Sequence, residues 1–320
     1  MTRPLLIPLS VAITCVLSFP AFSSQGDESE KEEESYYSQL TRAVVRLEEH
    51  RSLCTPGREW SSEWNATVGS AFFVRDSFEG ESRFFIVTAR HVVEERADLF
   101  ARVQMGPETQ RQAVLALPRS LWVFHPEPAP LGSLPIDVAV MQVTSQPFIK
   151  AFLNCPTGGE KGECGRNEKT NTPLEHALFE SPSVMEHAIF FGFPGGDVAK
   201  QSAEPFARSG VVAYTAPNPE LKINNKPVVH DSVYFVDALA FPGNSGGPVL
   251  RDPLPQRPGP GVQLWGLVTG GNRIGRDYAI VTRPEKIAET LAHARKTAKV
   301  NEDGWSTKLP SLPVRCAPDR

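Results

Sequence analysis

Residues 241–250 read Phe-Pro-Gly-Asn-Ser-Gly-Gly-Pro-Val-Leu and are the most informative stretch of the 320-residue chain. Glycines on both sides of Ser245 favour a tight turn that presents the serine hydroxyl on an exposed corner. In such a turn the backbone amides of Gly243 and Ser245 can converge on one point and form an oxyanion hole. The alternative interpretation is an ordinary glycine-serine turn between strands, so the rest of the chain decides between the two.

A histidine and an aspartate elsewhere in the chain have the chemistry to activate Ser245. His91 follows an apolar segment, residues 85–89, and an imidazole there can accept the serine proton and return it to a leaving amine. Asp137 opens the apolar segment 137–143, where a buried carboxylate needs a partner such as an imidazole N–H. A lone histidine in such a place is more often structural, so the hypothesis rests on all three motifs occurring together.

The chain resembles chymotrypsin-fold (trypsin-like) serine peptidases over residues 43–299. His91, Asp137 and Ser245 occur in the family order, in the contexts Thr-Ala-x-His, Asp-x-Ala-Val and Gly-Asn-Ser-Gly-Gly-Pro. The resemblance implies that Ser245 is the nucleophile, His91 the general acid and base, and Asp137 the group that orients His91. It further implies an oxyanion hole built from the Gly243 and Ser245 amides, and no metal or organic cofactor.

Within this family the motifs point to particular branches. Residues 236–245 and 277–281 are similar to the bacterial HtrA/Deg-type branch, while residues 192–195 are similar to secreted trypsin-like and glutamyl endopeptidases. Digestive relatives carry an aspartate before the nucleophile that pairs with a new N-terminus, whereas this chain carries Asn244. We therefore expect no activation by that switch, and no PDZ domain, because only about twenty residues follow the last expected helix.

The arrangement of apolar residues predicts an all-β fold. Glycine (24 residues) and proline (29) are too frequent for coiled coils or helical bundles. Short apolar runs that are separated by turn residues predict strands: 66–75, 83–89, 101–105, 113–124, 137–143, 188–192, 206–215, 227–240, 262–268 and 278–282. With the resemblance, these runs predict two antiparallel six-stranded β-barrels.

Helical spacing occurs in two places. Near the end of the chain Pro284 suits a first helical turn, and Ile287, Leu291 and Ala294 share one face, so we expect a C-terminal helix. A shorter helical turn is expected at 174–179.

The two ends of the chain differ in composition from its body. Residues 1–24 have Arg3, an apolar stretch and small residues before a polar run, and so predict a cleaved signal peptide. A membrane anchor is the alternative, but the apolar stretch is short and interrupted by prolines; lipid attachment at Cys15 is another. Residues 25–42 form an acidic linker or pro-segment and 300–320 a C-terminal tail. Export predicts a secreted or periplasmic protein without stable membrane insertion after cleavage.

The charge distribution restricts the partners. The formal net charge of −4 comes from the acidic cluster at 27–34 with Arg3, and the rest of the chain is neutral. A neutral body without runs of Lys or Arg argues against nucleic acid, so the expected partner is a protein or peptide substrate. The sequence makes no prediction of the oligomeric state.

Four cysteines remain after removal of the leader, and an oxidising compartment favours two disulfides. Three pairings are possible. We favour Cys155 with Cys164, because loop residues separate them, which leaves Cys54 with Cys316. No Cys-x-x-Cys or His-Glu-x-x-His motif supports zinc.

The specificity pocket is predicted from the resemblance. Leu239 stands where trypsins hold an aspartate, so cleavage after Lys or Arg is disfavoured and small or medium apolar P1 residues are expected. Thr269, Gly270 and Gly271 occupy the segment that pairs with an extended substrate. Arg276 falls near the pocket wall, where it either points to solvent or selects an acidic P1 residue.

Two other functions remain open. The same fold can serve as a non-catalytic peptide-binding protein, although the three intact residues weigh against it. It can also be a protease that is active only after a partner orders its loops. Labelling with a fluorophosphonate separates the first alternative from catalysis.

Overall fold

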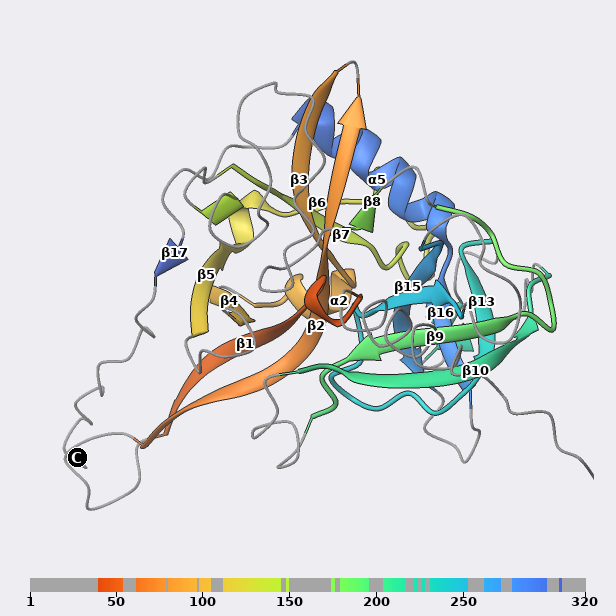
Figure 1. Cartoon of the computed structure of the whole chain (residues 1–320), viewed down its shortest axis with the longest axis horizontal. Coiled ribbons are helices and arrows are strands. Elements are labelled where there is room, and N and C mark those ends of the chain that lie inside the picture. Colours follow the sequence, from red (N-terminus) through yellow and green to blue (C-terminus); the bar gives the residue numbers. More distant parts are fainter. Residues whose placement is uncertain are drawn as a thin grey trace, which may run out of the picture. The chain divides into compact units, whose positions relative to one another are not determined.

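Strands make up most of the described residues in this computed structural model, and they form two sheets that meet near a short helix (Figure 1). The described residues belong to one unit, Ser38–Arg320. They are 40–53, 62–78, 80–96, 98–104, 112–144, 148–149, 174–175, 179–195, 204–216, 222–223, 226–227, 231–252, 262–271, 278–297 and 305–306. Among them no helix has the length and apolar character needed to cross a bilayer.

The first sheet is curled and open, with strand order β17-β5-β4-β1-β2-β3-β7-β6 and with β8 paired parallel to β2. Its strands are β1 (Val44–Leu53), β2 (Ser62–Phe78), β3 (Glu81–Thr88), β4 (Asp98–Gln104), β5 (Gln112–Pro118), β6 (Val123–Phe124), β7 (Ala139–Val143), β8 (Leu174–Glu175) and β17 (Trp305–Ser306). β2, β3 and β7 pair antiparallel through apolar residues, and Phe85 and Ile86 of β3 are fully buried. These three strands support the short helix that contains His91 and the segment before β7 that contains Asp137.

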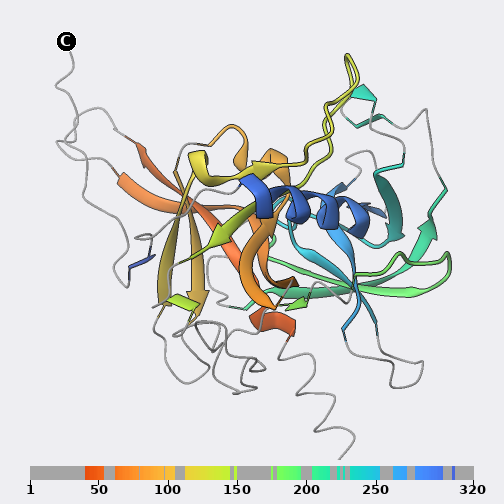
Figure 2. The ribbon, with the colours of Figure 1, turned by 90° about the horizontal axis from the view of Figure 1, so that it is seen from above.

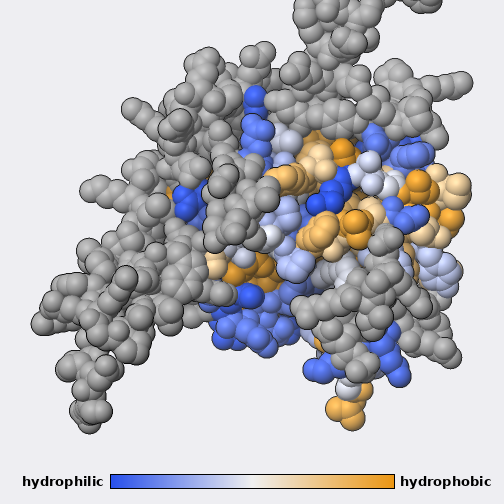
Figure 3. Space-filling model, turned by 90° about the horizontal axis from the view of Figure 1, so that it is seen from below, coloured by the Kyte–Doolittle hydropathy of each residue, from blue (hydrophilic) through white to orange (hydrophobic). Residues whose placement is uncertain are grey.

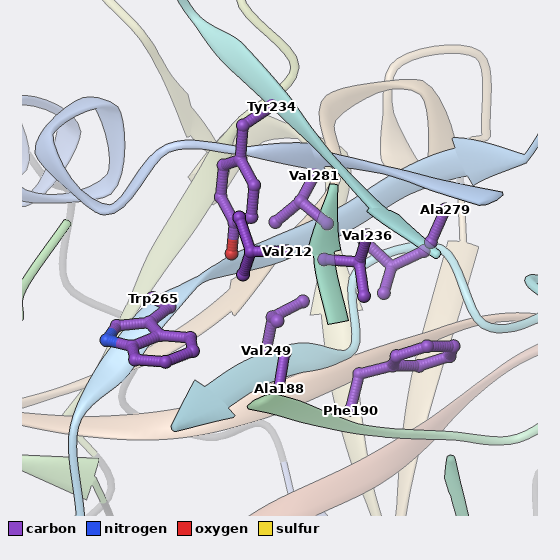
Figure 4. Packing of buried hydrophobic residues seen from close by; sticks show 10 residues of the cluster. Ala188, Phe190, Val212, Tyr234, Val236, Val249, Trp265, Ala279 and Val281 are labelled. Carbon is purple, nitrogen blue, oxygen red and sulfur yellow. The ribbon is translucent and has the colours of Figure 1, made fainter. Parts of the chain in front are cut away.

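The second sheet closes into a six-stranded antiparallel barrel, in the order β10-β13-β16-β15-β14-β9. Its strands are β9 (His187–Gly192), β10 (Phe206–Tyr214), β13 (Val233–Asp237), β14 (Pro248–Arg251), β15 (Leu264–Gly271) and β16 (Tyr278–Thr282). Side chains from all six strands converge inside the barrel, with Phe190, Tyr234 and Trp265 the largest (Figure 4). Alternation of inward apolar and outward residues is the pattern that closes such a barrel. A separate hairpin pairs β11 (Lys222–Ile223) with β12 (Lys226–Pro227).

Besides the strands, the described fold includes a short helix, a longer helix and a 3-10 turn, η1 (Arg119–Leu121). α2 (Arg90–Val93) is a single turn after β3 and contains His91. α5 (Pro284–Thr297) packs against β6 and β7 of the first sheet and β15 of the barrel, so it joins the two sheets (Figure 2). Ile287, Leu291 and Ala294 are fully buried on this helix, which confirms the predicted helix and its apolar face.

The all-β class, one six-stranded barrel and the C-terminal helix agree with the sequence prediction, while the first sheet differs by remaining open. The predicted strand 113–124 is divided into β5, η1 and β6, because Pro118 has no N–H to continue the ladder. The helical turn expected at 174–179 is wrong at its start, where β8 pairs with β2. Strand 227–240 is shorter than predicted, and β1 and β14 were not predicted.

Large hydrophobic residues that remain exposed are spread over several elements and loops. They are Phe78, Leu131, Val184, Met185, Tyr214, Leu239 and Phe241. On the face shown in Figure 3 hydrophobic residues lie in small groups between hydrophilic ones. Two of them, Leu239 and Phe241, lie six and four residues before Ser245 in the sequence.

Candidate active site

His91 and Asp137 are joined by two hydrogen bonds. The Nδ1 atom of His91 lies 2.7 Å from Oδ2 of Asp137, and the backbone N–H of His91 donates to Oδ1 at 2.8 Å. Asp137 is largely buried, with 15% of its side chain exposed, whereas the His91 side chain is 51% exposed. One carboxylate therefore fixes both the main chain and the ring of His91 and leaves its Nε2 edge directed away from Asp137.

The surroundings of His91 change its pKa in opposite directions. Burial favours the neutral ring and lowers the pKa, and the nearby Arg96 adds to this effect. The charge of Asp137 and its hydrogen bond favour the imidazolium, and together they raise the pKa of His91 above its usual 6.5. Asp137 thus both orients the ring and stabilises the cation that forms when the ring accepts a proton.

Ser245 lies in a turn that contacts both sheets. The backbone N–H of Ser70, in β2, donates to the Ser245 carbonyl at 2.8 Å, and the N–H of Gly246 donates to the carbonyl of Val268, in β15, at 2.7 Å. Gly246 has φ +86°, and a Cβ there would lie 2.1 Å from Oγ1 of Thr88. Only glycine fits at this position, and its absent side chain brings the Ser245 turn against the residues that precede His91.

No hydrogen bond joins the Ser245 hydroxyl to His91 among the residues that the structure describes. Catalytic hydrogen bonds are often long in free enzymes and shorten only with substrate bound. The structure thus brings His91 and Asp137 into direct contact and places the Ser245 turn beside them, without a formed hydrogen bond between the serine and the histidine.

The predicted oxyanion amides lie in the same turn. Gly243 is buried with φ +97°, and a Cβ there would lie 2.3 Å from the Phe193 carbonyl oxygen, so a larger residue does not fit. The N–H of Gly195 donates to the carbonyl of Pro242 at 2.6 Å. This carbonyl and the Gly243 N–H belong to the same peptide, and a trans peptide directs its C=O and N–H oppositely, so the Gly243 N–H points away from Gly195. Within the described part of the chain the amides of Gly243 and Ser245 donate no hydrogen bond, which leaves them available to a ligand oxygen.

The residues predicted for the specificity pocket lie on two neighbouring segments. Leu239 is 47% exposed, and Thr269, Gly270 and Gly271 are half-buried at the end of β15. A Cβ at Gly271 would lie 2.9 Å from the Ala240 carbonyl oxygen, so β15 ends against the segment that carries Leu239. A Cβ at Gly270 would meet nothing within 4 Å, which leaves open space over this strand.

Ser70 is a site residue that sequence reasoning missed. It is fully buried in β2, and its hydroxyl donates to the Gly243 carbonyl at 2.7 Å while accepting the N–H of Phe193 at 2.8 Å. Its partners are 123 and 173 residues away in the chain. The residues next to Ser70 in the sequence do not indicate these contacts, which become apparent only in the fold.

A cluster of possible metal ligands follows β6. His125, Glu127 and Glu289 place ligand-type atoms within 4.8 Å of one another. His125 Nε2 lies 2.8 Å from Glu289, its Nδ1 accepts the N–H of Glu127 at 3.2 Å, and Lys286 Nζ lies 3.2 Å from Glu289. Because both ring nitrogens have partners and an ammonium group already neutralises the carboxylates, we interpret the cluster as an ion-pair network between the loop after β6 and α5.

Several sequence predictions lie outside the described residues. They are the signal peptide 1–24, most of the acidic segment 25–42, Arg276 and the four cysteines Cys54, Cys155, Cys164 and Cys316. These remain predictions.

Comparison with known families identifies the class of protein. The β-barrel, the open sheet and the His91–Asp137 pair beside a Gly-Asn-Ser-Gly-Gly turn are features of a chymotrypsin-like fold. A family model, the trypsin-like peptidase domain, matches residues 69–253, more than half of the chain. The chain therefore belongs to the trypsin-like peptidase family, and this membership supports a serine protease. No curated protein matches the chain.

Solved structures with a similar fold are distant in sequence. The protease domain of MamO from Magnetospirillum magneticum is 15% identical, with 80% of this chain and 98% of that chain covered and a TM-score of 0.47. The active form of the Rv3671c protease from M. tuberculosis is 18% identical, with 93% and 97% covered and a TM-score of 0.46. The HtrA-type protease AlgW, in complex with a decapeptide, is 15% identical, with 82% and 66% covered and a TM-score of 0.46.

Proposed function

We propose that this protein is an exported serine endopeptidase that hydrolyses peptide bonds through an acyl-enzyme on Ser245. The observation that carries the proposal is the pair of hydrogen bonds from one carboxylate, Asp137, to the ring and the main chain of His91. Such a pair fixes the tautomer of the ring and leaves its other nitrogen free to accept a proton. The glycine-rich turn with Ser245 and two free amides lies against the same segment.

The proposed reaction begins when the Ser245 hydroxyl attacks the substrate carbonyl. Its proton passes to Nε2 of His91, while Nδ1–H stays bonded to Asp137 and the imidazolium is stabilised by the carboxylate. The carbonyl oxygen gains negative charge and accepts hydrogen bonds from the Gly243 and Ser245 amides. His91 then protonates the leaving amine, and a water molecule repeats the sequence to release the acid and regenerate Ser245.

The proposed specificity is for small or medium apolar P1 residues. Leu239 offers an apolar side chain beside the end of β15, and the open space over Gly270 suits an extended peptide that pairs with the strand. Arg276 is the residue that would instead select an acidic P1 residue. A peptide library decides between the two, since Arg276→Ala should change the ranking of P1 residues only if this side chain lines the pocket.

The proposed location of the enzyme follows from the predicted leader, residues 1–24. Residues 1–24 carry the charge, length and small residues of a cleaved signal peptide. Mature protein from the culture medium or periplasm should begin near residue 25, as N-terminal mass analysis would show.

The test of catalysis is covalent labelling with a fluorophosphonate. The wild type should be labelled on Ser245 and should cleave a casein substrate, and Ser245→Ala should lose both activities while remaining folded. Ser77→Ala is the matched control, because Ser77 is an exposed serine on β2 whose hydroxyl hydrogen-bonds to that of Ser82. A folded wild type that is neither labelled nor active would instead support the peptide-binding alternative.

A further inference from the structure

Ser70 uses each of its polar groups in a different contact around the proposed site. Its N–H donates to the Ser245 carbonyl at 2.8 Å, and its carbonyl accepts the Thr88 hydroxyl at 2.7 Å. Its hydroxyl donates to the Gly243 carbonyl at 2.7 Å and accepts the N–H of Phe193 at 2.8 Å. One fully buried residue of the first sheet thus connects the turn that holds Gly243 and Ser245 with Phe193 and with Thr88, three residues before His91.

The hydroxyl of Ser70 acts on the backbone that carries the oxyanion amides. Gly243 has φ +97°, and glycine rotates freely about both backbone bonds unless its neighbouring peptides are held. The peptide before it is held by Gly195 N–H on the Pro242 carbonyl. The peptide after it is held at both ends, by the Ser70 hydroxyl on the Gly243 carbonyl and by the Asn244 N–H on the Phe241 carbonyl. With both peptides held, the Gly243 N–H has one direction, on the side away from Gly195.

The same hydroxyl also binds the 193–195 segment, which packs against the Gly243 turn. Phe193 N–H donates to it, and the Phe193 carbonyl oxygen lies where a Cβ of Gly243 would be. Ser70 therefore sets the spacing between the 193–195 segment and the Gly243 turn. An alanine at this position would leave a buried carbonyl and a buried N–H without partners, since water cannot reach a fully buried position.

We propose that Ser70 is a positioning residue for the oxyanion hole, which holds the Gly243 peptide in the orientation that stabilises the transition state. This proposal rests on the proposed serine-peptidase function. Ser70 does not touch the substrate and acts only through the backbone of Gly243 and Phe193. Its removal should lower transition-state binding and leave ground-state binding of the peptide unchanged.

The kinetic test compares Ser70→Ala with the wild type and with the control Ser77→Ala. Loss of a direct oxyanion donor reduces kcat by about 10²–10³-fold, so loss of a group that only orients the donor should reduce kcat by about 10–100-fold. KM should stay within about twofold, and the affinity for a peptide boronate, which forms a tetrahedral adduct, should fall in parallel with kcat. Unchanged kcat and boronate affinity in folded Ser70→Ala would overturn the proposal.

A second measurement does not depend on activity. Hydrogen exchange should accelerate at Asn244 and Gly247, whose amides are bonded to the Phe241 and Asn244 carbonyls, and should remain unchanged in β13 and β16. Uniform acceleration over the whole barrel, or no acceleration in the turn, would mean that Ser70 has no positioning role. If the wild type is inactive but the turn alone loosens in Ser70→Ala, the proposed enzymatic function fails and the positioning role stands.

Discussion

The two sheets that meet at the proposed site are stabilised in different ways. The closed barrel encloses an apolar cluster in which Phe190, Tyr234 and Trp265 are fully buried. The open sheet buries charges: Glu48 accepts two hydrogen bonds from Arg102 at 2.6 and 2.7 Å, and Asp76 accepts two from Arg295 of α5. The Ser245 turn lies on the apolar barrel, and Asp137 lies on the sheet that contains buried ion pairs.

The two sheets therefore make different contributions to the proposed site. A tightly packed barrel holds the Ser245 turn rigidly, because changing the turn would disturb close-packed side chains. A sheet whose buried charges are paired by arginines can accommodate the Asp137 carboxylate without an arginine partner, because His91 pairs with it. Four predictions test this difference between the barrel and the open sheet, beginning with the largest expected effect.

Asp137→Asn should have the largest effect, because it removes charge from the sheet side of the site. The magnitude known for this substitution in trypsin-like triads is about a 10⁴-fold loss of kcat. Without the carboxylate, only burial and the charge of Arg96 act on His91, and both lower its pKa, which should therefore fall below that of the wild type. Stopped-assay kcat measurements over pH should show a small residual activity that extends to lower pH, and a kcat equal to the wild type would contradict the assigned role.

Phe190→Ala should be the most damaging change to the barrel. Phe190 is fully buried among side chains from all six barrel strands, so its truncation leaves a cavity and should lower the free energy of unfolding by about 3–5 kcal/mol. Urea denaturation measures this quantity. Leu131→Ala is the control, because Leu131 is completely exposed at 106% and should change stability by less than about 0.5 kcal/mol.

Arg295→Met tests the ion pairs of the open sheet. Asp76 is 1% exposed, so loss of its arginine leaves a buried carboxylate, and the free energy of unfolding should fall by about 3 kcal/mol or more. The double variant Asp76→Leu, Arg295→Met should be more stable than Arg295→Met alone, because it also removes the buried carboxylate that has lost its arginine. Thermal unfolding of both variants decides this, and a double variant less stable than the single one would show that charge is not the cause.

Met185→Gly should have the smallest effect and the opposite sign. Met185 precedes β9 of the barrel with φ +73°, a left-handed conformation that costs an L-residue about 1 kcal/mol. Glycine adopts it freely, so the melting temperature should rise slightly, although glycine also gains entropy in the unfolded chain. Val184→Gly, its neighbour without a positive φ, should lower the melting temperature instead, and equal signs for the two variants would rule out strain as the cause.

The sequence predicted the parts of this fold that depend on local pattern. The strand 278–282 agrees with β16 residue for residue, and the face of α5 was identified from Ile287, Leu291 and Ala294, because apolar spacing records which side is buried. His91 and Asp137 were predicted as partners, and they form two hydrogen bonds. Their catalytic roles and that of Ser245 remain predictions for the experiments above.

Features that depend on distant partners were not predictable. β1 was not identified because Arg46 and Glu48 interrupt its apolar residues, yet both are buried as an ion pair whose second arginine, Arg102, comes from β4. β14 follows the Ser245 turn and has four residues, which are too few to show an alternation of apolar and polar residues. Ser70 was also not predictable, since the partners of its hydroxyl lie more than 120 residues away.

The most direct test of the central claim is the rate of fluorophosphonate labelling of Ser245 as a function of pH. The claim is that His91, with its pKa raised by Asp137, activates Ser245 only when the ring is neutral. The rate should therefore be low in acid and rise with an apparent pKa above 6.5, and mass analysis should place the label on Ser245. A labelling rate that does not depend on pH, or a label on another residue, would contradict the account.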